Sequence, residues 1–207
     1  MKRVFSVLMV ILCAITLSSC GGKNNVVNDD AGKVNGKEVE EKYTSNGEEN
    51  PVAGKSITEF KVKDIYGNEV TEEIFKDKKI TMINIWATSC GPCLREIPYL
   101  QEIYAEKKED GFNLVGIVAD GYSEDNLEVA KKIIEKNNVE YTNLLMAEGS
   151  LKEIVSEFQY VPVTLYVDSE GKIKEVFSAG AETKEEYLEK INKLLEEESK
   201  ENEKKMD

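Results

Sequence analysis

Two cysteines separated by two residues, Cys90 and Cys93, stand between an apolar run and a helical pattern. The apolar run is Ile80 to Trp86, and the helical pattern continues from Leu94 to Ile97. Two thiols at this spacing on a strand-to-helix junction can close into a small disulfide ring and open again. The pattern therefore predicts electron transfer carried by the protein's own side chains.

The cysteine count tests the other uses of such a pair. The chain has four cysteines and no histidine, and Cys13 and Cys20 lie in a segment that we expect to be removed or lipidated. A structural zinc site needs about four nitrogen or sulfur ligands, so two remaining thiols do not supply one. Covalent haem attachment needs a histidine directly after the second cysteine, where Leu94 stands. A purely structural disulfide stays open as the alternative, and we expect no metal and no cofactor.

Residues 1–19 have the pattern of a secretion signal. Lys2 and Arg3 supply the positive start, and Val4 to Leu17 is a mostly apolar stretch of 14 residues, which is short for a bilayer span. The stretch ends in Leu17-Ser18-Ser19-Cys20, which resembles the lipobox of bacterial lipoproteins. That resemblance implies cleavage before Cys20 and a lipid on its thiol, so that the chain is anchored outside the cytoplasm. An uncleaved anchor or an ordinary signal remains the alternative.

The charge balance limits the partners. The chain carries 27 basic and 40 acidic side chains, a net charge of −13, and loss of Lys2 and Arg3 leaves 25 against 40, or −15. An acidic surface repels phosphate backbones and anionic lipid headgroups, so we expect no nucleic-acid partner. Membrane attachment would then depend on the lipid at Cys20.

Residues 20–53 are predicted to form a flexible tether. Only six apolar side chains occur between Gly21 and Asn50, too few to bury a core. A flexible coil of this length reaches on the order of 30 Å. At the other end, residues 199–207 form a charged tail in this interpretation.

Residues 54–198 alternate between strand and helix patterns. Strands are expected at 60–65, 80–86, 112–119, 141–145, 163–167 and 172–177, and helices at 91–108, 123–137, 150–158 and from 183. Ser150 to Glu153 has the form of a capping box, and Gly171 stands where a turn favours positive φ. This order predicts an α/β fold, a mixed sheet with helices on both faces.

Three separated motifs carry a family resemblance. They are Asn84 to Cys93, Pro98 in the next helix, and Val161-Pro162-Val163-Thr164 before a strand. Together they resemble the thioredoxin superfamily, in its membrane-anchored TlpA/ResA-like branch. The resemblance implies a thioredoxin-like fold with an extra N-terminal strand or hairpin and a central βα insertion, and an extracytoplasmic location.

The helix start assigns different roles to the two thiols. A free thiol with a pKa of about 8.5 is mostly protonated at neutral pH, but Cys90 would face the positive end of the helix dipole, which lowers its pKa. Cys90 is expected to be open and to attack the substrate disulfide, and Cys93, one turn inside, to be covered and to resolve the mixed disulfide. Gly91 and Pro92 border the pair, and the resemblance to reducing thioredoxins favours a reductase.

Glu96 lies three residues after Cys93 and so on the same helix face. A carboxylate there can accept the proton that Cys93 must lose, particularly if burial raises the pKa of the acid. Thioredoxins place an aspartate on the preceding strand for this task, and Asn84 occupies that position here. The resemblance therefore implies Glu96 as the proton acceptor, and a solvated helix glutamate is the alternative.

Pro162 is expected to be cis, so that Val161 offers its backbone to an extended substrate. Without the resemblance, the pair would be an ordinary edge or turn proline. Trp86 is predicted to pack beside the active-site turn as part of the substrate-binding surface, and core filling explains it equally well. Pro98 should shape the first helix. Asp120 to Tyr122 could border the site or form a surface loop.

Several functions share this chemistry. The preferred one is a membrane-tethered thiol:disulfide oxidoreductase, monomeric, that reduces disulfides of exported proteins and is recharged by a membrane electron donor of the CcdA/DsbD type. Alternatives are a dithiol oxidase and a non-catalytic lipoprotein of thioredoxin fold. The Pro-x-x-x-Thr-x-x-Cys pattern of thioredoxin-fold peroxidases is absent around Cys90, and a copper carrier would need a histidine. Ser89 replaces the usual aromatic residue before the first cysteine, which leaves the choice of partner open.

Overall fold

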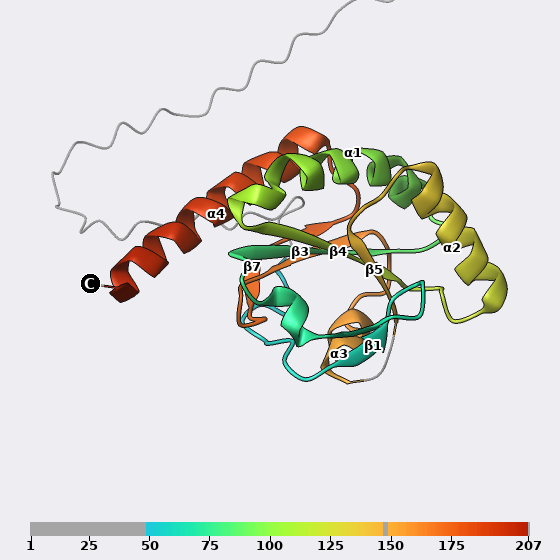
Figure 1. The fold of residues 1–207 in the computed structure, drawn as a ribbon, viewed down its shortest axis with the longest axis horizontal. Helices are drawn as coiled ribbons and strands as arrows, with labels where there is room; N and C mark the ends of the chain where they lie inside the picture. Colours follow the sequence, from blue (N-terminus) through green and yellow to red (C-terminus); the bar gives the residue numbers. More distant parts are fainter. Residues whose placement is uncertain (1–48, 147–148, 207) are drawn as a thin grey trace, which may run out of the picture. The chain divides into compact units, whose positions relative to one another are not determined.

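The computed structural model describes residues 49–146 and 149–206 (Figure 1). The predictions for the signal, for lipidation at Cys20 and for the tether up to residue 48 lie outside these residues.

A mixed five-stranded sheet forms the centre of the domain. Its strands are β3 (Ile80–Trp86), β4 (Phe112–Val118), β5 (Thr142–Leu145), β6 (Val163–Val167) and β7 (Ile173–Ala179), in the spatial order β5-β4-β3-β6-β7. Strands β3, β4 and β5 are parallel, whereas β6 and β7 run antiparallel to their neighbours. Every residue of β3 and β4 is buried, as their continuous apolar runs predict.

Helices cover both faces of this sheet (Figure 1). They are α1 (Gly91–Lys107), α2 (Glu124–Lys136), α3 (Ser150–Ser156) and α4 (Lys184–Met206). Alternate residues of β3 separate the two sides: Met82 packs with α1 and α4, whereas Ile83 and Ile85 pack with α3. Trp86 shares a cluster with α1 and α2. The predicted α/β architecture, a mixed sheet with helices on both faces, is confirmed.

The N-terminal strand predicted at 60–65 is a hairpin, β1 (Lys61–Lys63) with β2 (Glu69–Thr71). The Asp64 side chain ends β1, because its Oδ1 accepts from the backbone N–H groups of Tyr66 at 2.8 Å and Asn68 at 2.9 Å. Two short 3₁₀ turns, Glu72–Phe75 and Lys108–Asp110, were not predicted.

The N-terminal segment also contacts the two outer strands of the sheet. At one edge, Ile65 N–H donates to the carbonyl of Asn143 on β5 at 2.9 Å. At the other edge, Gly54 N–H donates to the carbonyl of Ile173 on β7 at 2.9 Å, and Ile173 N–H donates to Lys55 O at 2.8 Å. Each edge therefore has part of its backbone already paired.

Both predicted domain boundaries are too narrow. Val52 is fully buried, and Asn50 Nδ2 donates to Lys174 O at 2.9 Å, so the packed domain begins before residue 54. At the other end, α4 continues to Met206, so residues 199–206 are helical. Contacts with the sheet side support this extension, because Lys79 Nζ donates to Ser199 Oγ at 3.1 Å and Lys174 pairs with Glu198.

The predicted capping box at Ser150 is wrong, because Gly149 occupies the N-cap position at φ 86° and Ser150 is already helical. Among the residues that the structure describes, no side chain caps this helix start. A reciprocal cap does form at α4, where Thr183 N–H donates to Glu186 Oε2 at 2.8 Å and Glu186 N–H donates to Thr183 Oγ1 at 3.3 Å. Both helix starts have a Ser or Thr followed three residues later by Glu. The backbone conformation at Gly149 is the difference, because it places Ser150 inside the helix instead of at the N-cap.

Candidate active site

Cys90 and Cys93 form a disulfide at the start of α1, with Cα atoms 5.3 Å apart. Cys90 is the N-cap residue, and its Sγ accepts the backbone N–H of Cys93 at 3.2 Å. The helix therefore directs a free N–H group and its positive end at this sulfur, as predicted. Such an environment favours a negative charge on Cys90 when the pair is reduced.

The two cysteines differ in exposure, as expected from their places in the helix. Cys90 is half-buried, whereas Cys93 is 0 % exposed and packs in a cluster with Trp86 and Ile97. Gly91 and Pro92 are exposed at the rim of the pair. An incoming disulfide can therefore reach Cys90 first.

The Val161-Pro162 peptide bond is cis, and it lies directly across from the cysteines. The carbonyl oxygen of Val161 is 3.6 Å from Cys90 Sγ, and Val161 is half-buried whereas Pro162 is buried. The segment leads into β6, which pairs with β3 and so brings residue 161 to the end of the strand that precedes Cys90. A polypeptide lying along Val161 would place its sulfur beside Cys90.

Trp86 does not line the binding surface, which corrects its predicted role. Its side chain is 0 % exposed, and Nε1 donates to Asn143 Oδ1 at 3.0 Å. Gly116 makes room for this bond, since a Cβ atom there would lie 2.0 Å from Asn143 Oδ1. Trp86 supports the active-site turn from within the core.

Asp120 borders the site, which is one of the two predictions for its segment. Its carboxylate accepts from Thr88 N–H at 3.0 Å and from Thr88 Oγ1 at 2.6 Å, and its backbone carbonyl accepts from Asn126 Nδ2 at 2.9 Å. The end of β4 thus fixes the turn that carries Cys90. Tyr122, two residues on, is exposed.

Glu96 is buried, so the alternative of a solvated helix glutamate is wrong. Its side chain is 0 % exposed, Oε1 accepts from Asn84 Nδ2 at 2.8 Å, and Oε2 accepts from the hydroxyl of Tyr187 at 3.1 Å. Burial raises the pKa of Glu96 to about 7, although the two hydrogen bonds lower it. A carboxyl group with this pKa can both accept and return a proton near neutral pH.

Tyr187 and Thr164 belong to this environment and were not predicted as parts of it. Thr164 Oγ1 lies 3.2 Å from Asn84 Nδ2 and 3.3 Å from the hydroxyl of Tyr187. Thr164 lies in the Val161-Pro162-Val163-Thr164 motif, whereas no local pattern indicates that Tyr187 of the last helix reaches Glu96.

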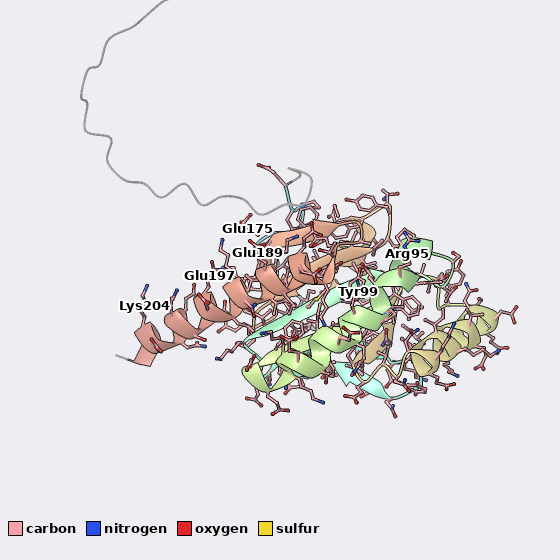
Figure 2. All side chains as sticks on the ribbon, turned by 90° about the horizontal axis from the view of Figure 1, so that it is seen from above. Arg95, Tyr99, Glu175, Glu189, Glu197 and Lys204 are labelled. Atoms are coloured by element: carbon pink, nitrogen blue, oxygen red, sulfur yellow. A yellow bond between two sulfur atoms is a disulfide. The ribbon has the colours of Figure 1, made fainter. Side chains whose placement is uncertain are left out.

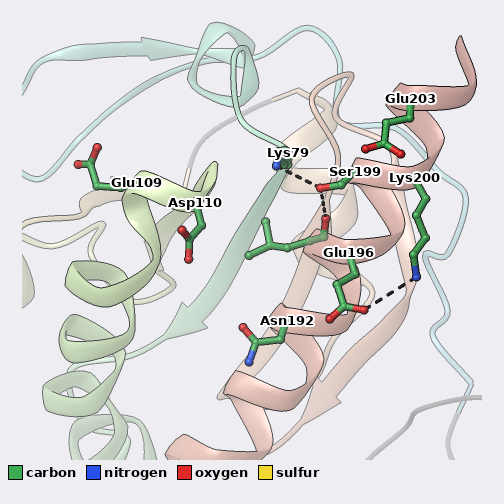
Figure 3. Close-up of a pocket in the computed structure, with 9 residues that line it drawn as sticks. Lys79, Glu109, Asp110, Asn192, Glu196, Ser199, Lys200 and Glu203 are labelled. Atoms are coloured by element: carbon green, nitrogen blue, oxygen red, sulfur yellow. Dashed lines mark hydrogen bonds and ion pairs between the residues drawn. The ribbon is translucent and has the colours of Figure 1, made fainter. Parts of the chain in front are cut away.

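A large cavity of about 840 Å³ lies at the far end of α1 from the cysteines (Figure 3). It opens between Lys79, Asp110 and the C-terminal half of α4, and it contains carboxylates and lysines but no thiol. Since α1 is 17 residues long, about 25 Å separate its two ends. This cavity is therefore not part of the redox site. Among the described residues, no group of three or more carboxylate or thiol side chains could hold a metal ion.

A smaller groove of about 270 Å³ adjoins the cysteines through Val161. Its lining is mostly apolar and comes from β3, α3, the residues directly after β4 and β5, and the segment before Pro162: Ile85, Ala119, Met146, Val155, Ser156, Phe158, Gln159, Tyr160 and Val161. Met146 and Tyr160 are among the most exposed large apolar side chains of the described residues.

Comparison with known proteins agrees with this geometry. The Redoxin family profile matches residues 52–195. A relative from Bacillus thuringiensis subsp. konkukian (strain 97-27), thiol-disulfide oxidoreductase ResA, is 31% identical over 149 residues, which cover 70% of this chain and 81% of the relative. The chain belongs to the Redoxin family, as a ResA-like member of the thioredoxin superfamily.

Solved structures support the same assignment. The thioredoxin domain of a thiol-disulfide oxidoreductase from Bacteroides vulgatus is 26% identical with a TM-score of 0.55, covering 69% of this chain and 97% of that domain. StoA from Bacillus subtilis has a TM-score of 0.52 at 24% identity, covering 67% of this chain and 98% of StoA. With its Cys90–Cys93 pair, this ResA-like chain is a thioredoxin-like thiol-disulfide oxidoreductase. None of the helices in the described residues has the length and apolar character needed to cross a bilayer.

Proposed function

We propose that this oxidoreductase works outside the cytoplasm, tethered to a membrane, and that it reduces disulfides of exported proteins. The proposal is supported mainly by the different exposure of the two cysteines. Cys90 is half-buried, Cys93 is fully buried, and the buried acid Glu96 lies one turn further along the helix. This arrangement provides one sulfur for attack, one for release and one group for the proton.

The reaction starts from the reduced pair. The Cys90 thiolate attacks one sulfur of the partner's disulfide, forming a Cys90–partner bond and releasing the other partner sulfur as a thiolate. Cys93 then gives its proton to Glu96 and attacks Cys90 Sγ, which releases the second partner thiolate and closes the Cys90–Cys93 disulfide. The partner gains two electrons, and a dithiol donor in the membrane must return two electrons to the pair.

The groove beside Val161 supports a polypeptide as the substrate. It begins at the residue whose carbonyl lies 3.6 Å from Cys90 Sγ, and its lining is mostly apolar. An extended segment on Val161 would place a side chain near its cysteine into this groove, where apolar burial contributes about 25 cal/mol per Å². Proteins with an unfolded segment and an apolar residue beside the cysteine fit this site.

Replacing Met146 with Glu should weaken binding of such proteins. Met146 is 39 % exposed in the groove, and a carboxylate there would be desolvated by an apolar segment. We expect KM for an unfolded protein that contains a disulfide to rise about tenfold, while the rate with a small soluble disulfide is unchanged. Val129→Glu is the matched control, because Val129 is similarly exposed but lies on α2 outside the groove. Equal effects of the two variants would show that added charge alone is responsible.

The reduction potential of the Cys90–Cys93 pair tests the direction of electron flow. The full chain is equilibrated in buffers of defined thiol-disulfide ratio, and the fraction of free thiol is measured by alkylation. A reductase should have a potential below about −200 mV, whereas a value near −120 mV is typical of a dithiol oxidase. The second outcome, together with formation of disulfides in a reduced protein, would replace reduction with oxidation as the function.

The membrane tether is part of the proposal and rests on the lipobox pattern at Leu17 to Cys20 and on the polar residues that follow it. Its test is expression of the full chain in a bacterium: a Cys20→Ala variant should leave the membrane fraction. A variant that stays there contradicts lipid anchoring at Cys20.

A further inference from the structure

The carboxyl group of Glu96 is one corner of a closed ring of four buried side chains. Asn84 and Tyr187 donate to its two oxygens at 2.8 and 3.1 Å, and Thr164 Oγ1 closes the ring at 3.2 Å from Asn84 Nδ2 and 3.3 Å from the Tyr187 hydroxyl. The four residues come from α1, β3, β6 and α4, and none is more than 1 % exposed. Four separate elements therefore meet at one acid.

Two members of the ring are hydroxyl groups, which can each donate or accept. With Glu96 ionised, Tyr187 donates to Oε2 and Thr164 can donate to Tyr187. With a proton on Oε2, Glu96 can donate to the Tyr187 oxygen, and Tyr187 can turn its own proton to Thr164 Oγ1. The two hydroxyl groups can thus follow the proton of Glu96 without displacement of a heavy atom, whereas Asn84 Oδ1 has no hydrogen-bond partner among the described residues.

The charged groups around the ring do not neutralise Glu96. In the described part of the chain, Lys190 is bonded to Glu182 and to Ser178 Oγ, and no ion pair involves Glu96. Arg95, next to Glu96 in sequence and on the same helix as Tyr99 in Figure 2, is exposed and forms no ion pair with Glu96 among the described residues.

The remaining titratable neighbours are uncharged. Burial raises the pKa of Tyr99 to about 12 and those of Tyr141 and Tyr166 further, so these phenols stay neutral, and Cys93 is held in the disulfide. An ionised Glu96 is thus stabilised by hydrogen bonds, of which Tyr187 supplies one.

We propose that Tyr187, backed by Thr164, is a positioning residue that holds the Glu96 carboxyl in place while it takes up and releases the proton of Cys93. The inference rests on the proposed role of Glu96 as proton acceptor. A hydrogen bond to a carboxylate is stronger than one to a neutral carboxyl group, so loss of the Tyr187 hydroxyl favours the protonated acid. The carboxyl also loses one of the two contacts that fix its orientation.

The test compares Tyr187→Phe with Tyr99→Phe in the full chain. Tyr99 is the matched control, since its ring centroid lies 6.4 Å from that of Tyr187 and its hydroxyl donates to the Glu182 carbonyl instead of Glu96. The Glu96 midpoint is measured by NMR of carbon-13-labelled carboxyl groups in the oxidised protein. The rate at which Cys93 releases glutathione from a Cys90–glutathione disulfide is measured across pH.

Tyr187→Phe should raise the Glu96 midpoint by about one pH unit, which corresponds to a tenfold change in its ionisation constant. The acid limb of the release rate should move by the same amount, and Tyr99→Phe should leave both unchanged. Thr164→Val should shift the Glu96 midpoint and the acid limb in the same direction, but by a smaller amount. It serves as the second variant if Tyr187→Phe folds poorly. An unmoved midpoint in Tyr187→Phe, or an equal shift in Tyr99→Phe, would overturn the proposal. The titration is readable even in a chain that reduces no partner, so failure of the proposed function would be seen separately.

Discussion

The Cys93→Ser variant should remain covalently bound to its partner proteins through Cys90. Attack by Cys90 needs no help from Cys93, but release does, because Cys93 is the sulfur already bonded to Cys90 in the oxidised structure. Full burial also prevents an external thiol from replacing Cys93 at that position. Reduction of a protein disulfide over many turnovers should fall to background, and non-reducing gels with mass spectrometry should find the partner on Cys90.

The double variant Cys90→Ser/Cys93→Ser is the control for this trapping, and it should form no mixed disulfide. Cys13 and Cys20 are the other cysteines of the chain, so trapping that persists in the double variant would point to them. A Cys93→Ser variant that turns over like the wild type would contradict the two-sulfur mechanism. The attached proteins would also identify the physiological substrates.

The Glu96→Gln variant should release mixed disulfides about a hundredfold more slowly, which is the lower end of the range for general acid-base catalysis. The pKa of Glu96, raised by burial to about 7, should make wild-type release fall with decreasing pH below 7, where a protonated acid cannot accept the Cys93 proton. Glutamine removes this group at every pH, so the acid limb near pH 7 should disappear. Stopped-flow measurement of glutathione release between pH 5 and 9 would detect both changes.

The same substitution should stabilise the fold above neutral pH. Glu96 binds its proton more tightly in the folded chain, at a pKa of about 7, than in the unfolded chain at 4.5. Folded molecules therefore hold more protons between these values, and the free energy of unfolding falls as pH rises through this window and then levels off. This pKa difference corresponds to a loss of about 3 kcal/mol in the free energy of unfolding at high pH. Glu96→Gln should recover part of that loss at pH 8. Denaturant unfolding at pH 5 and pH 8 would measure it.

The pH profile of the release rate distinguishes a proton acceptor from a structural residue. The stability change does not, because it follows from the raised pKa of Glu96 alone. If Glu96→Gln is destabilised equally at pH 5 and pH 8 and retains its acid limb, another group takes the proton.

The strands and helices of the fold could be predicted from the sequence because their signals are local. The buried runs that became β3 and β4, and the N-cap position of Cys90, each depend on a few adjacent residues. The cis bond before Pro162 required the resemblance to a known family. The hairpin was only partly predicted, since the Glu69–Thr71 strand is too short to show a pattern.

The surroundings of Glu96 could not be predicted in this way. Its two hydrogen-bond donors, Asn84 and Tyr187, lie 12 and 91 residues away, and the sheet and α4 must both be in place before they meet. The sequence assigns Trp86 to the substrate-binding surface because it is an aromatic residue four positions before Cys90. This local signal is misleading. The bond of Trp86 to Asn143 of the outer strand turns the side chain inward.

The pairing of the outer strands has a consequence for the proposed action on unfolded exported proteins. Open strand edges are templates on which extended polypeptides add and aggregate. Here Ile65 occupies part of the β5 edge, and Gly54 and Lys55 occupy the start of β7. We expect a partner protein bound through one sulfur to find fewer free backbone groups at these two edges, and so to dissociate after disulfide exchange instead of adding a strand to the sheet.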